Sequence, residues 1–188
     1  FHFNAYIFRK IDNFQDISLH TIKAILILDN DGRRIIAKYY GADSMPSVKE
    51  QRAFETSLFA KTSKNLAAEI VMFEGYTCVF KSNVDLIFYV IGDAVENELI
   101  LSNTLNTLYD AVSQILKKNV EKRALLDSLD LVFLAIDELC DSGIVLETDS
   151  IQLVSRVGSR LDDTQQLEGS VTQVLQQAKE QFKWSLLK

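Results

Sequence analysis

TIKAILILDNDGRRIIAKYY, residues 21–40, is the stretch that decides the fold. It contains the nearly continuous apolar run Ala24–Leu28, which is typical of a strand covered on both faces of its sheet. Asp29-Asn30-Asp31-Gly32 has the composition of a tight turn, and residues 33–40 follow it as a second strand. We therefore expect a β-hairpin whose first strand lies between two layers of helices.

A helix is predicted after this hairpin. Residues 41–46 break the strand pattern and contain Pro46, the only proline of the chain. Ser47 then precedes Glu50 by three positions, which is the spacing of an N-terminal capping box. The helix is expected to extend to about Lys64 and to place four apolar side chains near one face. These are Val48, Phe54, Leu58 and Phe59.

Three more strands are predicted at residues 68–73, 76–81 and 84–91, and Gly92 ends the last of them. They are separated only by Glu74-Gly75 and Ser82-Asn83. Linkers this short force neighbouring strands to run antiparallel, so the three strands form a meander. The expected sheet therefore has five strands.

Helices are predicted for the remaining residues, because from about Asn97 the apolar residues recur with a helical period. The first helix carries the stripe Leu101, Leu105, Leu108, Val112 and Ile115. A second helix, from about Glu121 to Ser142-Gly143, carries Leu125, Leu129, Val132, Phe133 and Ile136. A short helix (residues 150–157), a polar stretch (158–169) and a last helix (170–187) follow.

The order ββ-α-βββ-αα predicts an α+β fold, with a five-stranded antiparallel sheet, helices on both of its faces and a helical C-terminal tail. A one-sided sheet would leave the second face of the first strand exposed. The domain is expected to span residues 19–147, between an N-terminal extension (1–18) and the tail (148–188).

Composition argues against nucleic acid and membrane insertion. The 188 residues carry a net charge of −6, and no apolar run approaches the ~18 residues that cross a bilayer. We interpret the basic cluster Lys117, Lys118, Lys122 and Arg123 as a solvated helix end rather than a site for nucleic acid or lipid headgroups. Cys78 and Cys140 are flanked by apolar residues and are expected to be buried thiols.

No pattern of catalytic, cofactor-binding or metal-binding residues is recognisable. His2 and His20 are the only histidines, and neither forms a metal-ligand pair with a cysteine or another histidine. Counted from Asp29, a calcium loop would need Gly at the sixth and Glu at the twelfth position, where this chain has Arg34 and Tyr40. Glycine-rich phosphate loops and a nucleophile elbow are also missing from the sequence. We expect a protein that is not an enzyme and needs no cofactor.

Several segments resemble the zeta chains of the COPI coatomer, within the family of adaptor small chains that share a longin/profilin-like domain. They are Thr21–Gly32, Ala37–Tyr40, Pro46–Gln51, Phe88–Gly92, Lys118–Leu126 and Ala178–Leu187. The resemblance covers the chain from about Leu19 to its end. Residues 137–149 match less closely and are similar to the adaptor small chains as well.

The resemblance implies an interaction role. Chains of this kind pair with the trunk of the coatomer gamma subunit, join other coatomer subunits and meet an Arf-type GTPase only indirectly, through the large chain. It also implies a place in the cytoplasm, on Golgi membranes and COPI vesicles, in Golgi-to-ER retrograde and intra-Golgi transport. Candidate anchors of the interface with the partner are Phe54, Leu58, Phe59 and Trp184. An alternative of equal weight is that these side chains fill the chain's own core.

Three other classes of protein are alternatives to this interpretation. A sigma-type small chain of a clathrin adaptor is the nearest, but the C-terminal segment that contains Trp184 favours zeta. A longin-domain SNARE would need a heptad-patterned coil and a membrane anchor, and residues 1–188 contain neither. A small-molecule sensor or enzyme on a similar sheet would need a cavity with convergent polar groups.

Overall fold

The computed structural model describes residues 19–41, 47–64 and 69–160. The predicted extension (1–18) and last helix (170–187) lie outside these residues. Within them, five antiparallel strands form one sheet in the order β2-β1-β5-β4-β3. The strands are β1 (Ile22–Asp29), β2 (Arg34–Tyr39), β3 (Ile70–Phe73), β4 (Tyr76–Asn83) and β5 (Leu86–Asp93). The predicted five-stranded antiparallel sheet is confirmed.

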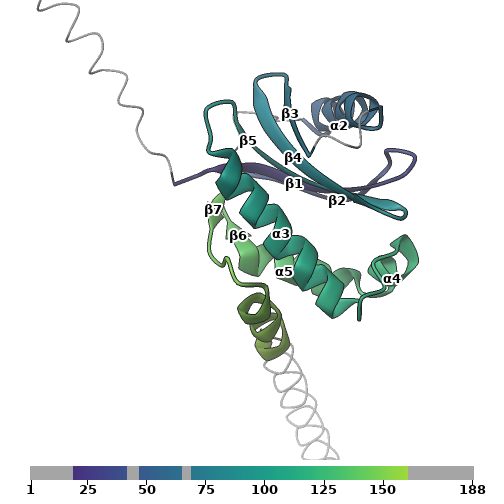
Figure 1. Cartoon of the computed structure of the whole chain (residues 1–188), viewed down its shortest axis with the longest axis vertical. Helices are drawn as coiled ribbons and strands as arrows, with labels where there is room; N and C mark the ends of the chain where they lie inside the picture. Colours follow the sequence, from purple (N-terminus) through teal and green to yellow (C-terminus); the bar gives the residue numbers. More distant parts are fainter. Residues whose placement is uncertain (1–18, 42–46, 65–68, 161–188) are drawn as a thin grey trace, which may run out of the picture.

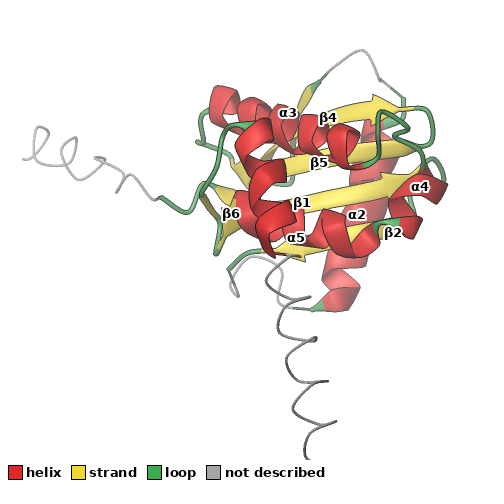
Figure 2. Cartoon of the chain, turned by 90° about the horizontal axis from the view of Figure 1, so that it is seen from below, coloured by secondary structure: helices red, strands yellow, loops and turns green. Residues whose placement is uncertain are grey.

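Helices cover both faces of the sheet, as predicted. Helix α2 (Val48–Thr62) lies on one face, and α3 (Glu98–Ile115) and α5 (Leu129–Leu139) lie on the other (Figures 1 and 2). Successive residues of the central strand β1 enter two separate buried clusters: Leu26 packs with the α2 side, and Ile25 and Ile27 pack with the α3 side. Both faces of β1 are therefore apolar, which explains its nearly continuous hydrophobic run.

A β-bulge in β2 changes which side chains reach α2. The pairing of β1 with β2 passes from Ile27–Ile36 to Leu28–Arg34, so that Ile35 has no partner. Side chains alternate between the faces of a regular strand, so Arg34 and Tyr39, at an odd spacing, would point to opposite faces. The extra residue shifts this alternation, and both side chains contact α2.

The turn between β4 and β5 lies two residues later than predicted. It consists of Val84 and Asp85, because Asn83 is already paired with Leu86. Contacts outside the hairpin hold it: the Asn30 side chain donates to the Val84 carbonyl at 2.9 Å, and the Asp85 carboxylate accepts from the Lys122 backbone N–H at 2.9 Å. The residues that make these contacts are distant in the sequence, which explains why the local pattern wrongly predicted the turn at Ser82-Asn83.

The helix predicted from Glu121 to Ser142-Gly143 is wrong in two respects. It is broken at Ser128 into α4 (Lys122–Asp127) and α5, and α5 ends at Leu139. A short hairpin follows, formed by β6 (Cys140–Asp141) and β7 (Ile144–Val145), and the Gly143 carbonyl accepts from the Ile22 backbone N–H at 3.0 Å. This docking against the start of β1 favours extended backbone at Cys140.

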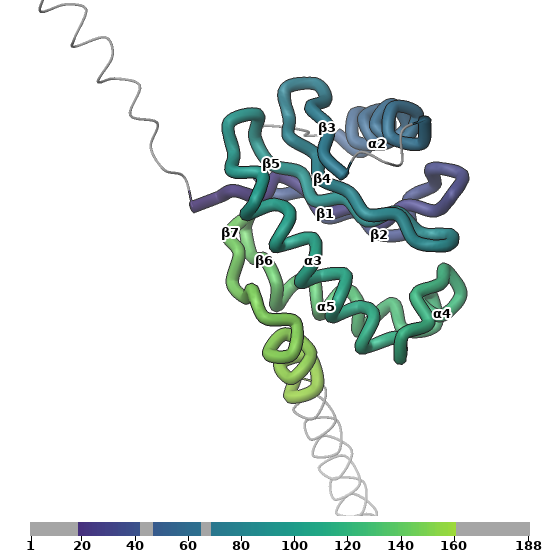
Figure 3. The backbone as a smooth tube through the Cα atoms, viewed as in Figure 1, coloured from purple at the N-terminus to yellow at the C-terminus, as the bar shows by residue number. Residues whose placement is uncertain are grey.

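Two details of the later helices also differ from the prediction. Phe133, expected on the apolar stripe, is 40% exposed, whereas Val132 and Ile136 are fully buried. Residues 150–160 are all helical, so Gly158–Arg160, expected in a polar linker, belong to this helix. Leu153 and Val157 are its buried residues, and the Thr107 hydroxyl of α3 donates to the Thr148 carbonyl just before it at 2.9 Å. The tube in Figure 3 passes from β6 and β7 into this helix, which is drawn in yellow-green.

Candidate partner interface

The four predicted anchors lie in different environments. Phe54 and Leu58 are only 4% and 0% exposed, so they lie in the chain's own core, which was the alternative left open. Phe54 packs against Phe73 and Tyr76, with ring centroids 5.4 and 5.8 Å away. Phe59 is half-buried on the same side of the sheet, and Trp184 lies outside the described residues.

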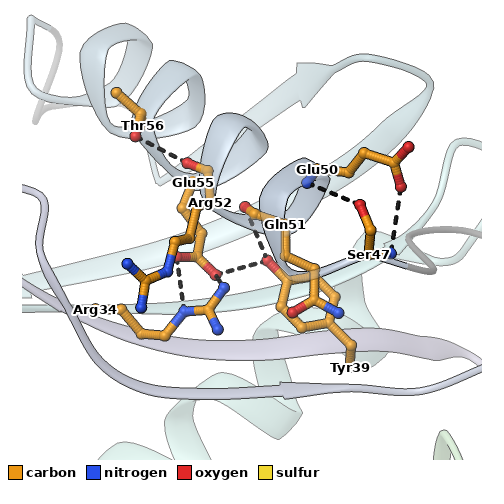
Figure 4. Close-up of polar contacts among 8 residues, drawn as sticks. All are labelled: Arg34, Tyr39, Ser47, Glu50, Gln51, Arg52, Glu55 and Thr56. Atoms are coloured by element: carbon orange, nitrogen blue, oxygen red, sulfur yellow. Dashed lines mark hydrogen bonds and ion pairs between the residues drawn. The ribbon is translucent and has the colours of Figure 1, made fainter.

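Helix α2 is fastened to β2 by a buried carboxylate (Figure 4). Arg34 donates twice to Glu55, from Nε to Oε2 at 2.9 Å and from Nη2 to Oε1 at 2.6 Å. The Tyr39 hydroxyl donates to Oε1 at 2.8 Å. Burial raises the pKa of Tyr39, and its hydrogen bond to Glu55 raises it further. Since the Glu55 side chain is only 4% exposed, these three donors replace its hydration.

The first turn of α2 carries the predicted capping box. The Glu50 backbone N–H donates to Ser47 Oγ at 3.2 Å, and the Ser47 backbone N–H donates to Glu50 Oε2 at 3.3 Å. Both bonds satisfy N–H groups that a helix leaves free at its start, so the position of the helix start is fixed by side chains.

The β1–β2 turn is organised by Asp29. Its Oδ1 accepts from the backbone N–H groups of Asp31 and Arg33 at 3.0 and 2.8 Å, and its Oδ2 accepts from Lys122 Nζ at 2.7 Å. Burial raises the pKa of Asp29, but the hydrogen bond from Lys122 and those from the backbone outweigh it and hold the pKa below its ordinary value. The turn interpretation of this acidic segment is thereby confirmed, and Lys122 has its partner inside the chain.

The edge of the sheet at β3 exposes apolar side chains. Ile70 and Met72 are 39% and 56% exposed, because β3 is an edge strand. Val95, after β5, and Leu99, in the first turn of α3, are 67% and 77% exposed. The apolar residues of 68–73 predicted a strand but gave no signal for this exposure, because the position of a strand within its sheet is set by distant pairings.

The polar groups do not converge into a catalytic site in the part of the chain that the structure describes. Cys78 and Cys140 are free and buried; burial raises the pKa of both thiols, that of Cys78 to about 12, so neither is a ready nucleophile. His20 is exposed, with Nδ1 2.7 Å from the Ser142 carbonyl oxygen. No cluster of three or more potential metal ligands occurs among the described residues.

None of the described helices combines the length and the apolar character that crossing a membrane requires.

Comparison with known proteins defines the class to which this fold belongs. Residues 21–165 match the family described as clathrin adaptor complex small chain. A chain in a homology model of the full-length AP-3 complex in a stretched open conformation has the same fold, with a TM-score of 0.61 at 16% sequence identity; the match covers 79% of this chain and 98% of that one. The chain belongs to the clathrin adaptor small-chain family.

Sequence similarity places it within one branch of that family. The chain is 57% identical to coatomer subunit zeta-1 of Bos taurus and of Homo sapiens, over 91% of this chain and 96% of each relative. It is 43% identical to coatomer subunit zeta-1 of Arabidopsis thaliana, over 89% and 97%. The chain is therefore a member of the coatomer zeta branch.

Proposed function

We propose that this chain is the small subunit of a COPI vesicle coat and pairs directly with the trunk of the coatomer gamma subunit. The observation that carries the proposal is the 57% identity to two coatomer zeta-1 subunits along nearly their whole length. In this role the chain acts at the cytoplasmic face of Golgi membranes, in Golgi-to-ER retrograde and intra-Golgi transport. An Arf-type GTPase would reach it only through the large chain.

The arrangement of the domain supports binding rather than catalysis. The helices of the chain cover both faces of its sheet, and the two core clusters fill the space between the layers. A partner therefore meets the outer surfaces of helices, the edges of the sheet and the turns. These are the surfaces on which exposed apolar and charged side chains remain.

Co-expression with a coatomer gamma trunk, followed by size-exclusion chromatography, tests the proposal. We expect a stable 1:1 complex, measured by light scattering across the peak. The trunk of a clathrin adaptor large chain serves as the control, and we expect it to elute separately. Binding to the adaptor trunk and not to gamma would contradict the proposal in favour of a sigma-type role.

A further inference from the structure

A hollow of about 380 Å³ opens between the β1–β2 turn and the side of α2. Its lining consists of Gly32, Arg33, Arg34, Arg52, Glu55 and Thr56. At Gly32 the backbone has φ +74°, and an added Cβ would lie 2.6 Å from the ring of Phe59. The turn therefore rests directly on an aromatic side chain of α2, which fixes one wall of the hollow against the other.

The charges around this hollow do not balance. Its lining has three guanidinium groups and one carboxylate, that of Glu55, and this carboxylate already accepts two hydrogen bonds from Arg34 and one from Tyr39. Arg33 reaches only the exposed carboxylate of Asp31, at 3.5 Å, with the two side chains 77% and 68% exposed. A pair this exposed contributes little, so Arg33 keeps donors available.

Arg52 is the second guanidinium with donors to spare. It forms no ion pair with any other residue in the described ranges. Figure 4 shows its side chain descending from α2 toward Arg34, and both residues line the hollow. The local excess of positive charge stands out in a chain whose net charge is −6.

One wall of the hollow is rigid before any ligand arrives. Arg34 is held in a two-pronged contact by Glu55, and its side chain is only 23% exposed. A site that is ordered in advance loses less conformational entropy on binding than a set of free surface side chains. Arg33, which pairs only with the exposed Asp31, and Arg52, which makes no ion pair within the described residues, both line this opening. Its volume has room for an acidic side chain together with the waters around it.

We propose that this hollow receives an acidic side chain of the large-chain partner, an Asp or Glu carboxylate bound by Arg33 and Arg52. The planar fork of a guanidinium matches a carboxylate in two parallel hydrogen bonds, and charge complementarity selects an acidic segment of the partner. The net charge of the chain disfavours an anionic membrane as the occupant, because a bilayer presents its charge over the whole facing surface. The inference rests on the proposed function and names the kind of contact by which pairing occurs.

Charge reversal on the full chain tests the inference. Arg33→Glu and Arg52→Glu remove the exposed donors and leave the Arg34–Glu55 contact in place. The matched control is Lys49→Glu, an equal change of charge at an exposed position of α2 that does not line the hollow. Thermal melts checked by circular dichroism establish that all three variants fold, and isothermal titration measures their affinity for the gamma trunk.

We expect each arginine variant to bind the gamma trunk about tenfold more weakly or worse, and the Lys49 variant to stay within about threefold of wild type. Equal affinities for all variants would overturn the inference and leave pairing with gamma intact. A wild-type chain that does not bind gamma would remove both the proposed function and the inference.

Two further measurements identify the occupant. In the Arg52→Lys variant, carbodiimide treatment of the gamma complex should link the new amine at position 52 to an Asp or Glu of gamma, found by mass spectrometry. Cross-links from other lysines alone would overturn the inference.

Flotation measures binding to vesicles that contain phosphatidylserine and phosphoinositide, and this binding should not change in the Arg33→Glu or Arg52→Glu variant. Loss of vesicle binding in these variants, with gamma binding unchanged, would assign the hollow to lipid headgroups instead.

Discussion

Glu55 links helix α2 to strand β2, because its carboxylate accepts hydrogen bonds from Arg34 and Tyr39 of β2. A buried carboxylate is favourable only while its hydrogen bonds and its countercharge are complete. The contact depends on the bulge at Ile35, which turns both donors toward α2. At the scale of single residues, the polar attachment of α2 to β2 therefore depends on this one group, beside the apolar packing of Phe54 and Leu58.

Glu55→Gln is expected to lower the free energy of unfolding by about 2–3 kcal/mol, because it leaves the partly buried Arg34 guanidinium without its countercharge. Urea denaturation at neutral pH measures the change. Glu121→Gln is the matched control: Glu121 is exposed and its side chain makes no capping bond, so we expect a change within about 0.5 kcal/mol. Equal losses in the two variants would show that Glu55 has no special role.

Asp29 makes the free energy of unfolding of this chain depend on pH. Its pKa in the folded chain is below the ordinary value, so the folded state binds its proton less readily than the unfolded state does. The stabilisation is therefore complete above the unfolded pKa of about 4 and is lost as the pH falls through the lower folded pKa. We expect Asp29→Asn to destabilise the chain at pH 7 and to differ less from wild type as the pH falls toward 3, measured by urea unfolding. A difference that does not depend on pH would contradict this account.

Elements of this fold begin and end where local chemistry and distant contacts agree. For α2 the local chemistry is the reciprocal pair of Ser47 and Glu50. We expect Ser47→Ala to cost about 1 kcal/mol, because the Glu50 N–H loses its acceptor at the start of the helix. Thermal unfolding checks this, with Ser57→Ala, an exposed position in the same helix, as a control that should not lose stability.

The features of the fold that the sequence predicted correctly have local causes. The capping box, the first hairpin and the burial of β1 on both faces follow from neighbours within a few positions. Other features were not predicted: the Val84-Asp85 turn, the break at Ser128 and the β6–β7 hairpin. Contacts with Asn30 and Lys122 determine the Val84-Asp85 turn, and contact with the start of β1 determines the β6–β7 hairpin. No pattern in a single segment contains that information.

The candidate site was predictable only in part, for the same reason. The sequence indicated α2 as a binding element and named Phe54 and Leu58, which the structure places in the core. It gave no sign that Arg33 and Arg52 share a hollow, since their proximity requires both the hairpin and the helix to be in place. Apolar residues report burial well, whereas a group of exposed charges is recognisable only after folding.

At the scale of the whole molecule, the described core extends from β1 into the helix of residues 150–160. The buried members of both core clusters lie between residues 22 and 153, and Val157 is buried just beyond them. We predict that residues 161–188 act on a partner rather than on this core. Trp184 stays a predicted anchor for gamma, since large aromatic side chains contribute disproportionately at interfaces.

Removing residues 161–188, the end of the predicted tail, separates the two possible roles of this segment. We expect the shortened chain to keep its melting temperature within about 3 °C, because the described core is untouched, and to bind the gamma trunk about tenfold more weakly. Trp184→Ala in the full chain should reproduce much of the loss of affinity, measured by isothermal titration, without a change in melting temperature. A large fall in melting temperature for Trp184→Ala would instead place Trp184 in the chain's own core. An unchanged affinity would leave the hollow beside α2 as the surface to map first.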